Sequence, residues 1–418
     1  MVSSLVCVDG EPSNVIGNTL SQAFAKPSFR RFFQTMEDGI EFGQLDVTLP
    51  DGSTYTVKGS KDGPHGVVYL RSWGAIPRIA GGGELGLAEV YMDGLVDTDD
   101  LKNLMDWALT NQDWFLTNMR TYGWSGFLAR VFHFLRPNSK NGSRRNIADH
   151  YDLGNAFYSE WLDNSMTYSS AVFDGSNSDD LYAAQQEKYR RIAETANMKP
   201  GDLVLEIGCG WGGFAEYAVK NVGVNMTCIT ISQEQHDFAA ARFQREGISD
   251  KIELRLQDYR DTEAERYDRV ASIEMIEAVG EQYWDTYFGQ IAKVLKPGGA
   301  AAIQAIIIPD DTFEEYLSKV DFISRYIFPG GRLLSHGIMR ECTERAGMKY
   351  EPNGEYAKSY AKTLLQWNDK FQAAWSKIRT MGFDERFKRM WEYYLVHCSV
   401  GFDFEQIGVA QIRLQKPA

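Results

Sequence analysis

A glycine-rich stretch, VLEIGCGWGGF (residues 204–214), follows an apolar run and is the clearest sign of chemistry in the chain. Gly208, Gly210 and Gly213 fit the G-x-G-x-x-G spacing of loops that let a nucleotide approach the backbone. A dinucleotide site also needs an acid about 20 residues further on, where it binds a ribose hydroxyl. The second predicted strand ends in CITIS, and no acid follows it until Glu234, which disfavours a dinucleotide.

An acidic residue inside the first strand suggests a different nucleotide. Glu206 lies two residues before the first glycine, and Gly212 continues the glycine series. The resulting E-x-G-x-G-x-G pattern resembles the S-adenosylmethionine loop of class I methyltransferases. In that interpretation Glu206 faces the ammonium region of the ligand, directly or through water. The alternative is a buried acid that caps neighbouring amides.

The elements around this loop alternate between strand and helix. Strands are expected at DLVLEIGC, NMTCITIS, IELRLQDY, YDRVASIEM and AAAIQAIII, and helices between them at GGFAEYAVKNV, QEQHDFAAARFQREG and YWDTYFGQIAKVL. This alternation predicts an α/β fold with a doubly wound parallel sheet. The ligand of such a sheet lies beyond the carboxyl ends of the strands, where the glycines are expected.

Residues 1–125 have a different pattern and predict a small α+β domain. FGQLDVTLPDGSTYTVKG predicts two strands around a Pro-Asp-Gly turn, and GVVYLRSW a third strand. GELGLAEVYMDGLVDTDDLKNLMDWALTN has apolar residues at helical spacing, with Asp97 or Thr98 as a candidate helix cap.

Residues 126–149 are turn-rich and locally basic. No acid stands between Ala129 and Asn146, and the basic residues there are Arg130, Arg136, Lys140, Arg144 and Arg145. A solvated linker is the plainer interpretation. Docking onto anionic phospholipid headgroups is the alternative, because the rest of the chain is acidic, with a formal net charge of −13.

Composition excludes several classes of protein. Hydrophobic residues make up 44% of the chain and charged residues 24%, as in globular proteins, and no apolar run is long enough to span a membrane. The N-terminus does not resemble a secretory signal, and the five cysteines and six histidines lack metal-ligand spacing. We therefore expect a cytoplasmic protein with free thiols, no metal and no nucleic-acid partner.

Seven stretches between residues 150 and 418 resemble, in order, the cyclopropane-fatty-acid synthase family of lipid methyltransferases. They are HYDLGNAFYSEWLDNSMTYSSAVF, VLEIGCGWGGFAEYA, TISQEQ, EMIEAVGEQYWDTYF, YIFPGGRLLS, SYAKTLLQWNDKF and RFKRMWEYYL. GELGLAEVYMDGLVD resembles the family's N-terminal helix more loosely. The resemblance implies a lipid-binding domain (1–125), a basic linker (126–149) and a class I methyltransferase domain (150–418) with a mostly parallel seven-stranded sheet.

The resemblance also implies a reaction. The methyl group of S-adenosylmethionine is added to the cis double bond of an unsaturated phospholipid acyl chain, so the weakly nucleophilic alkene must be aligned with the sulfonium away from water. A carbocation forms, which aromatic faces can stabilise. A base, thought in this family to be bound bicarbonate, then removes a proton from the new methyl group as the ring closes. Relatives further suggest a homodimer that associates peripherally with the inner membrane.

Site residues follow from the same resemblance. Those expected to bind the cofactor are Tyr168, Ser169, Glu206, Gly208, Gly210 and Gly212, with Thr230 and Gln235 on the ribose side and Asp258 and Tyr259 at the adenine. Those expected to form the bicarbonate cage are Ser170, Glu277, Gln304, Ile306 and Tyr360. Tyr360 and the backbone amides of Ser170 and Ile306 would donate to the anion, and Glu277 would accept its proton.

Two positions depart from the family pattern. Many members carry Cys where Ser170 stands and His where Gln304 stands, and glutamine cannot titrate near neutral pH. Either an amide holds the anion, or proton removal is organised differently. The second option includes relatives that make methylene-branched, methyl-branched or furan-precursor chains with a redox partner. The other hypotheses are an N- or O-methyltransferase of small molecules and a lipid-binding protein without activity.

Overall fold

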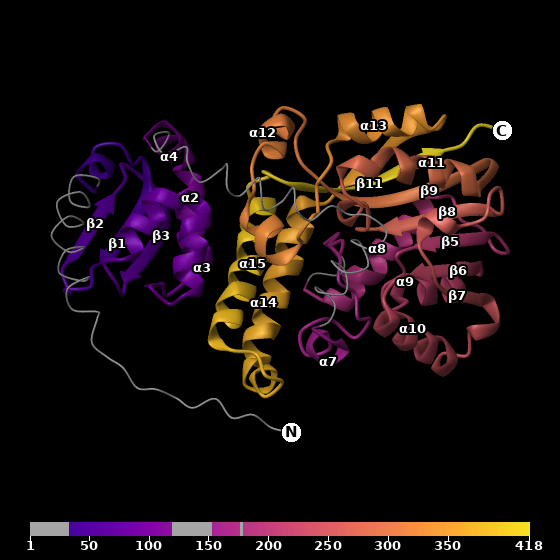
Figure 1. Cartoon of the computed structure of the whole chain (residues 1–418), viewed down its shortest axis with the longest axis horizontal. Helices are drawn as coiled ribbons and strands as arrows, with labels where there is room; N and C mark the ends of the chain where they lie inside the picture. Colours follow the sequence, from indigo (N-terminus) through magenta and orange to yellow (C-terminus); the bar gives the residue numbers. More distant parts are fainter. Residues whose placement is uncertain (1–32, 119–152, 176–178) are drawn as a thin grey trace, which may run out of the picture. The chain divides into compact units, whose positions relative to one another are not determined.

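The computed structural model describes residues 33–118, 153–175 and 179–418. The chain divides into two compact units, residues 1–125 and 126–418 (Figure 1). The basic stretch predicted at 126–149 lies outside the described residues. Among the helices that the structure describes, none combines the length and apolar character needed to cross a membrane.

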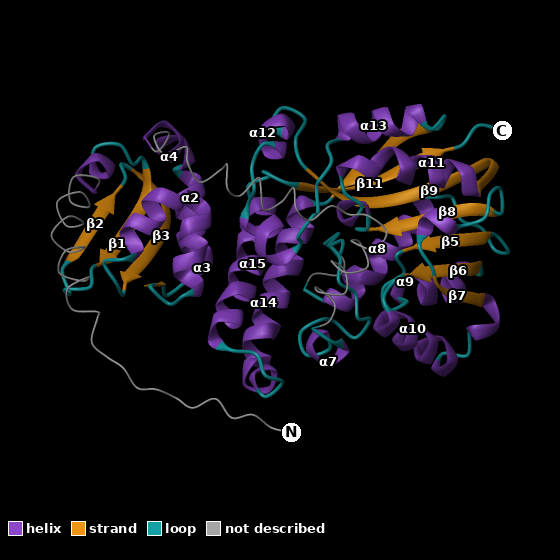
Figure 2. Cartoon of the chain, viewed as in Figure 1, coloured by secondary structure: helices purple, strands orange, loops and turns teal. Residues whose placement is uncertain are grey.

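The N-terminal unit contains a four-stranded sheet in the order β2-β1-β3-β4 (Figure 2). The strands are β1 (Phe42–Thr48), β2 (Thr54–Lys58), β3 (Lys61–Leu70) and β4 (Val96–Asp97). The helices are α2 (Ala75–Met92), α3 (Leu101–Thr110) and α4 (Gln112–Asn118). β1 pairs antiparallel with β2 across the predicted turn and parallel with β3. This mixture of strands and helices confirms the predicted small α+β domain.

The predicted helix cap in this unit is wrong by a few residues. Asp97 is part of β4, where it pairs with Tyr69 of β3. The N-cap of α3 is Asp100, whose carboxylate accepts a hydrogen bond of 2.9 Å from the backbone N–H of Asn103. Asp97 does not cap α3, because it pairs with a strand that is distant in the sequence.

The second unit is built on a seven-stranded sheet in the order β10-β11-β9-β8-β5-β6-β7. Its strands are β5 (Leu203–Ile207), β6 (Asn225–Thr230), β7 (Ile252–Leu256), β8 (Tyr267–Ile273), β9 (Leu295–Ile307), β10 (Lys349–Glu355) and β11 (Gly408–Gln415). β11 runs antiparallel to both β9 and β10, and the other pairings are parallel. The predicted doubly wound, mostly parallel sheet is confirmed.

Helices connect and cover these strands (Figure 2). They are α7 (Asn155–Tyr158), α8 (Leu181–Thr195), α9 (Gly213–Tyr217), α10 (Gln233–Arg245), α11 (Trp284–Val294), α12 (Phe313–Leu317), α13 (His336–Arg345), α14 (Ala357–Arg379) and α15 (Glu385–Asp403). Short 3-10 segments (Ser249–Lys251, Tyr259–Asp261, Ile276–Ala278, Glu281–Tyr283) and π segments (Ala218–Val222, Ile323–Ile327) complete the unit.

Alternation along β5 explains the two layers of helices. Leu205 and Ile207 join a hydrophobic core with α11 and α13, whereas Val204 joins a second core with α8, α9 and α10. Because successive side chains of a strand point to opposite faces, a nearly continuous apolar strand is what a sheet covered on both faces requires.

The strand order creates the crevice in which a ligand would bind. After β5 the chain builds β6 and β7 on one side and then returns to place β8 on the other side of β5. Connections therefore leave the carboxyl ends of β5 and β8 in opposite directions, which opens a crevice between them. Residues 208–213 follow β5 and residues 274–278 follow β8, so both segments lie at this crevice.

Candidate active site

The glycine loop forms an open shelf after β5. Gly208, Gly210 and Gly212 have φ angles of +78°, +51° and +83°, which favour glycine. A Cβ atom on Gly212 would lie 2.7 Å from the ring of Phe243, so this glycine allows close packing. A Cβ atom on Gly210 would meet nothing within 4 Å. The glycine loop therefore leaves the backbone at Gly210 next to open space that a ligand can occupy.

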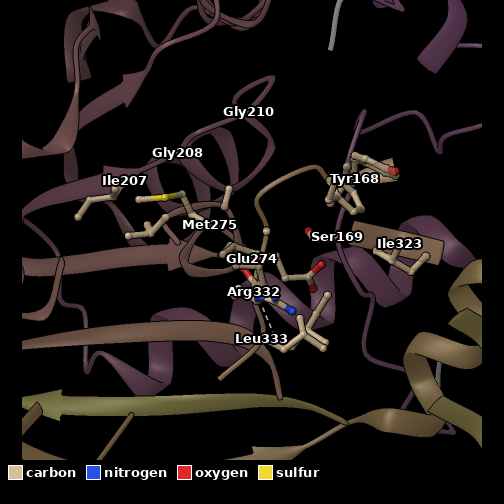
Figure 3. A pocket seen from close by; sticks show the side chains of 18 of the residues that line it. Tyr168, Ser169, Ile207, Gly208, Gly210, Glu274, Met275, Ile323, Arg332 and Leu333 are labelled. Atoms are coloured by element: carbon tan, nitrogen blue, oxygen red, sulfur yellow. Dashed lines mark hydrogen bonds between the residues drawn. The ribbon is translucent and has the colours of Figure 1, made fainter. Parts of the chain in front are cut away.

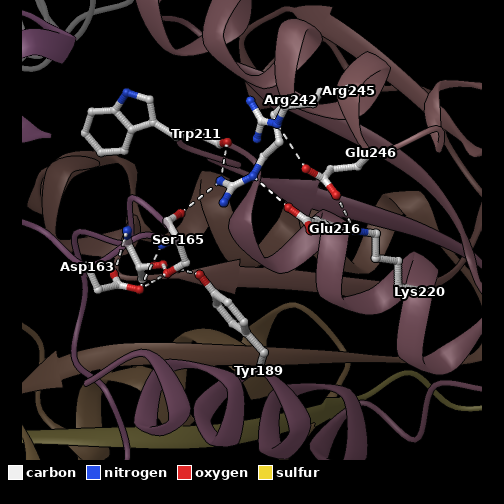
Figure 4. A network of polar contacts seen from close by, with 10 residues as sticks. Asp163, Ser165, Tyr189, Trp211, Glu216, Lys220, Arg242, Arg245 and Glu246 are labelled. Atoms are coloured by element: carbon white, nitrogen blue, oxygen red, sulfur yellow. Dashed lines mark hydrogen bonds and ion pairs between the residues drawn. The ribbon is translucent and has the colours of Figure 1, made fainter. Parts of the chain in front are cut away.

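One arginine holds the loop in place (Figure 4). Arg242 of α10 is 5% exposed and donates to the backbone oxygens of Trp211 and Ser165, both at 2.9 Å. It also donates to Glu216 of α9 at 2.8 Å. Arg242 therefore ties the glycine loop to α10, to α9 and to the segment that leads to Tyr168. Arg242 positions the glycine loop but does not line the adjoining cavity.

A cavity of about 400 Å³ adjoins the shelf (Figure 3). The predicted site residues that line it are Tyr168, Ser169, Glu206, Gly208, Gly210, Thr230, Gln235, Asp258, Tyr259, Glu277, Ile306 and Tyr360. Gly212, Ser170 and Gln304 are not among the lining residues. Its volume falls in the range of small-molecule sites. The structure thus brings together residues that are far apart in the sequence.

Polar groups surround the cofactor end of the cavity. Thr230 donates to the side chain of Gln235 at 2.9 Å, and both carboxylate oxygens of Asp258 accept from Arg260 at 2.8 and 2.6 Å. Burial raises the pKa of Tyr259 to about 12. Within the described residues its hydroxyl is a buried polar atom without a hydrogen-bond partner, and it is therefore available to a ligand.

A buried lysine and a buried glutamate flank this end. Lys188 of α8 is fully buried and donates to the hydroxyl of Ser169 at 2.7 Å. Burial lowers the pKa of Lys188 to about 7, although the nearby charges of Glu274, Asp163 and Glu206 oppose this shift. Burial likewise raises the pKa of Glu206 to about 8. Cationic and acidic groups thus share one enclosed region, and each affects the protonation of the other.

Glu274, the first residue after β8, occupies the centre of the predicted anion cage. One carboxylate oxygen accepts from the backbone N–H of Ser170 and from the amide of Gln304, both at 2.8 Å. The other accepts from the hydroxyl of Tyr360 at 2.7 Å. Figure 3 shows Glu274 among the lining residues, below the glycine loop and near Met275 and Arg332. Its backbone has a φ of +48°, which is unfavourable for a non-glycine residue.

Glu277 completes the same region. Its Oε1 accepts from the backbone N–H of Ile306 at 2.5 Å, and its Oε2 is a buried atom without a partner among the described residues. Burial, reinforced by the negative charge of Glu274, raises the pKa of Glu277 to about 8. At neutral pH this carboxyl group is mainly protonated and can donate a hydrogen bond into the cavity.

These contacts do not fit a bicarbonate ion. Each predicted donor already has an internal acceptor, because Ser170, Gln304 and Tyr360 bind Glu274 and the amide of Ile306 binds Glu277. S-adenosylmethionine fits better, because Gly210 faces open space and the hydroxyl of Tyr259 lacks a partner.

Aromatic rings form much of the remaining wall. Tyr168 and Tyr394 share a hydrogen bond of 2.8 Å between their hydroxyls, and Tyr360 stacks on Phe402 with ring centroids 4.4 Å apart. Phe328 also lines the cavity and packs edge-on against Tyr394. These faces offer an apolar surface that is also favourable for a cation.

Sequence reasoning missed Glu274 and Lys188. A signal for Glu274 was present, because an acid that directly follows a buried parallel strand must lie at the ligand edge of the sheet. Lys188 gave no such signal, since it stands in a helix among other charged residues, YAAQQEKYRR.

Comparisons with known proteins agree with this geometry. The family model described as "Mycolic acid cyclopropane synthetase" matches residues 138–412. Tuberculostearic acid methyltransferase UfaA1 of Mycobacterium tuberculosis is 35% identical over 352 residues, covering 80% of this chain and 79% of the relative. Cyclopropane-fatty-acyl-phospholipid synthase of Escherichia coli K12 is 34% identical over 382 residues, covering 88% of this chain and 94% of the relative.

Solved structures agree as well. The cyclopropane synthase MmaA2 of Mycobacterium tuberculosis superposes with a TM-score of 0.61 and 26% identity, covering 65% of this chain and 98% of that one. CmaA1, complexed with SAH and CTAB, gives a TM-score of 0.59 and 28% identity, with the same coverage. The chain therefore belongs to the cyclopropane synthase family and is an S-adenosylmethionine-dependent fatty-acyl methyltransferase of that type.

Proposed function

We propose that this enzyme transfers the methyl group of S-adenosylmethionine to the cis double bond of an unsaturated phospholipid acyl chain and forms a cyclopropane ring. The observation that carries the proposal is a single cavity that joins the bare glycine shelf to an aromatic wall. The shelf suits the cofactor, and the wall suits an acyl chain. The name of the relative from Escherichia coli points to the same product.

Each part of the cavity has a task in this proposal. Gly208 and Gly210 allow the cofactor to approach the backbone, and Tyr259 supplies a hydrogen-bonding group at the adenine end. The apolar wall excludes water and aligns the alkene with the methyl group. Tyr168, Phe328 and Tyr394 present aromatic faces that stabilise the cation formed on the acyl chain.

The enzyme acts on lipid at a membrane surface in this proposal. The N-terminal unit serves as the lipid-binding domain, and the basic stretch 126–149 contacts anionic headgroups. Membrane association is then peripheral and dependent on salt.

Two observations favour a second product. The relative at 35% identity is named a tuberculostearic acid methyltransferase, and this chain carries Gln304 where many family members carry His. A methylene- or methyl-branched chain is therefore the alternative product, with a redox partner where a saturated branch is made. Both outcomes begin with the same methyl transfer.

The test uses purified enzyme, S-adenosylmethionine with a trideuterated methyl group, and vesicles of oleoyl-containing phosphatidylglycerol. We expect S-adenosylhomocysteine and an acyl chain that gains one carbon and keeps two of the three deuterium atoms. Cyclopropane and methylene products have the same mass, so deuterium NMR must separate ring CD2 deuterons from vinylidene CD2 deuterons. Equal S-adenosylhomocysteine release with fully saturated lipid, or none with any unsaturated lipid, would refute the proposal.

A further inference from the structure

The protein itself supplies the anion that the cage was expected to recruit. The carboxylate of Glu274 receives one backbone N–H, one amide N–H and one phenol O–H, at 2.7–2.8 Å. Three convergent donors are what an ionised carboxylate requires, since a protonated acid has less acceptor capacity. The donors thus form a complete site around a residue of the chain.

The surroundings fix these donors. Ser170 and Gln304 are each 1% exposed, and Gln411 donates to the side-chain oxygen of Gln304 at 3.0 Å, which turns the N–H group of Gln304 toward Glu274. Burial holds the pKa of Tyr360 well above its ordinary value, so its hydroxyl keeps the proton that it donates. The carboxylate therefore has a defined position in the cavity wall.

The protonation of Glu274 suits a base. Enclosure by protein raises the pKa of its carboxyl group, while Lys188, Tyr360, Gln304 and Ser170 act in the opposite direction. Its three donors favour the ionised carboxylate, and burial makes that carboxylate a stronger proton acceptor than one in water. Its φ of +48° is strained for a non-glycine residue, and the structure keeps this conformation at the edge of the cavity.

We propose that Glu274 is the catalytic base of this enzyme and takes the place of bicarbonate in the reaction. This inference rests on the proposed methyl transfer to an acyl double bond. It also explains Gln304: a carboxylate that belongs to the chain needs a neutral donor beside it, and a histidine that titrates near neutral pH is not required.

Atoms, electrons and charge are conserved in the proposed step. The π electrons of the alkene form the new carbon–carbon bond, the methyl–sulfur bond breaks, and the positive charge passes from sulfur to the neighbouring acyl carbon. Glu274 then accepts a proton from the new methyl group, and the released C–H electron pair closes the ring. Glu274 becomes a neutral acid and returns its proton to solvent after the product leaves.

Two substitutions distinguish the effect of losing the carboxylate of Glu274 from the effect of opening the space that it occupies. Glu274→Gly removes the carboxylate and leaves room for an anion, and glycine accepts the φ of +48° without strain. Glu274→Gln removes the charge but fills the space. Glu265→Gly is the matched control, because Glu265 has the same φ of +48° and is exposed outside the cavity.

Activity is measured as S-adenosylhomocysteine release with unsaturated phospholipid vesicles, in buffer freed of carbon dioxide and with added bicarbonate. We expect the wild type and Glu265→Gly to be equally active in both buffers. The kcat of Glu274→Gly should fall about 10²-fold or more and recover in part with bicarbonate, whereas Glu274→Gln should stay low. Dependence of the wild type on bicarbonate, full activity of Glu274→Gln, or no recovery of Glu274→Gly would overturn the inference.

Two readouts without lipid keep this test separate from the proposed function. Carbon-13 NMR should detect bicarbonate binding to Glu274→Gly and none to the wild type. Calorimetry should show that all four proteins bind S-adenosylmethionine equally. A wild type inactive on every unsaturated lipid would refute the proposed function, whereas bicarbonate binding to the wild type would refute the role of Glu274.

Discussion

Gly210 is the position at which one side chain would do most damage to the cofactor site. Its missing Cβ faces open space, so a larger residue would not clash with the protein but would fill room that the ligand needs. The φ of +51° adds backbone strain for any other residue.

We expect Gly210→Val to lower the affinity for S-adenosylmethionine at least about tenfold, as measured by calorimetry. Gly247→Val is the control, because Gly247 also has a positive φ, of +67°, and open space around its Cβ, yet lies outside the cavity lining. Equal loss of affinity in both variants would mean that strain, rather than occupied space, weakens binding.

Glu277 should make stability depend on pH. An unfolded glutamate has a pKa near 4.3, whereas the pKa of Glu277 in the folded protein is about 8. Between these values the folded state holds a proton that the unfolded chain has lost, so this residue lowers the free energy of unfolding as pH rises. Its contribution is constant below the lower value and falls until pH passes about 8.

Glutamine cannot titrate, so Glu277→Gln should remove this slope. From pH 6 to 8 the unfolding free energy of the variant should rise relative to the wild type, by at most about 1.4 kcal/mol per pH unit. Urea denaturation at several pH values measures it. Glu265→Gln, at an exposed position, should run parallel to the wild type. Parallel curves for Glu277→Gln as well would show that Glu277 is ionised in the folded protein.

At the scale of elements, local sequence predicted the sheet well and the contacts between segments poorly. Alternating apolar strands and amphipathic helices are local patterns, and each predicted strand of the glycine-loop domain has its counterpart in β5 to β9. The cap at Asp100 was missed because Asp97 pairs with Tyr69 of β3, a strand that is distant in the sequence. The contacts of Glu274 could not be predicted, because its donors come from three separate segments, which only the folded sheet brings together.

Arg242 is the contact between elements on which the glycine loop depends. Removing this buried charge leaves two backbone oxygens without their donor, whereas Glu216 keeps its ion pair with Lys220. We expect Arg242→Ala to lower the unfolding free energy by about 2–5 kcal/mol, because each unsatisfied buried acceptor costs about 1–3 kcal/mol. Arg245→Ala on the same helix removes an exposed charge and should change it by about 0.5 kcal/mol or less. Similar urea midpoints for the two variants would contradict a clamping role.

At the scale of the whole molecule, net charge and local charge act against each other at a membrane. A chain of net charge −13 is repelled by an anionic surface, whereas the stretch from Ala129 to Asn146 carries basic residues and no acid. Each basic residue near such a surface contributes about 1 kcal/mol, and this attraction is screened beyond about 10 Å at 0.1 M salt. If the basic stretch docks the enzyme, binding must be strong at low salt and weaken as salt rises.

Reversing two of these charges tests that balance. Arg144→Glu combined with Arg145→Glu should weaken binding to phosphatidylglycerol vesicles at least about tenfold at 0.02 M salt and much less at 0.5 M, as measured by co-sedimentation. Lys251→Glu combined with Lys293→Glu changes the net charge equally at exposed positions of the second unit, so it reports the effect of overall repulsion alone. Equal loss in the two double variants would assign the effect to net charge. Unchanged binding of the arginine variant would make residues 126–149 a plain linker, and the N-terminal unit would then have to supply the attraction to lipid.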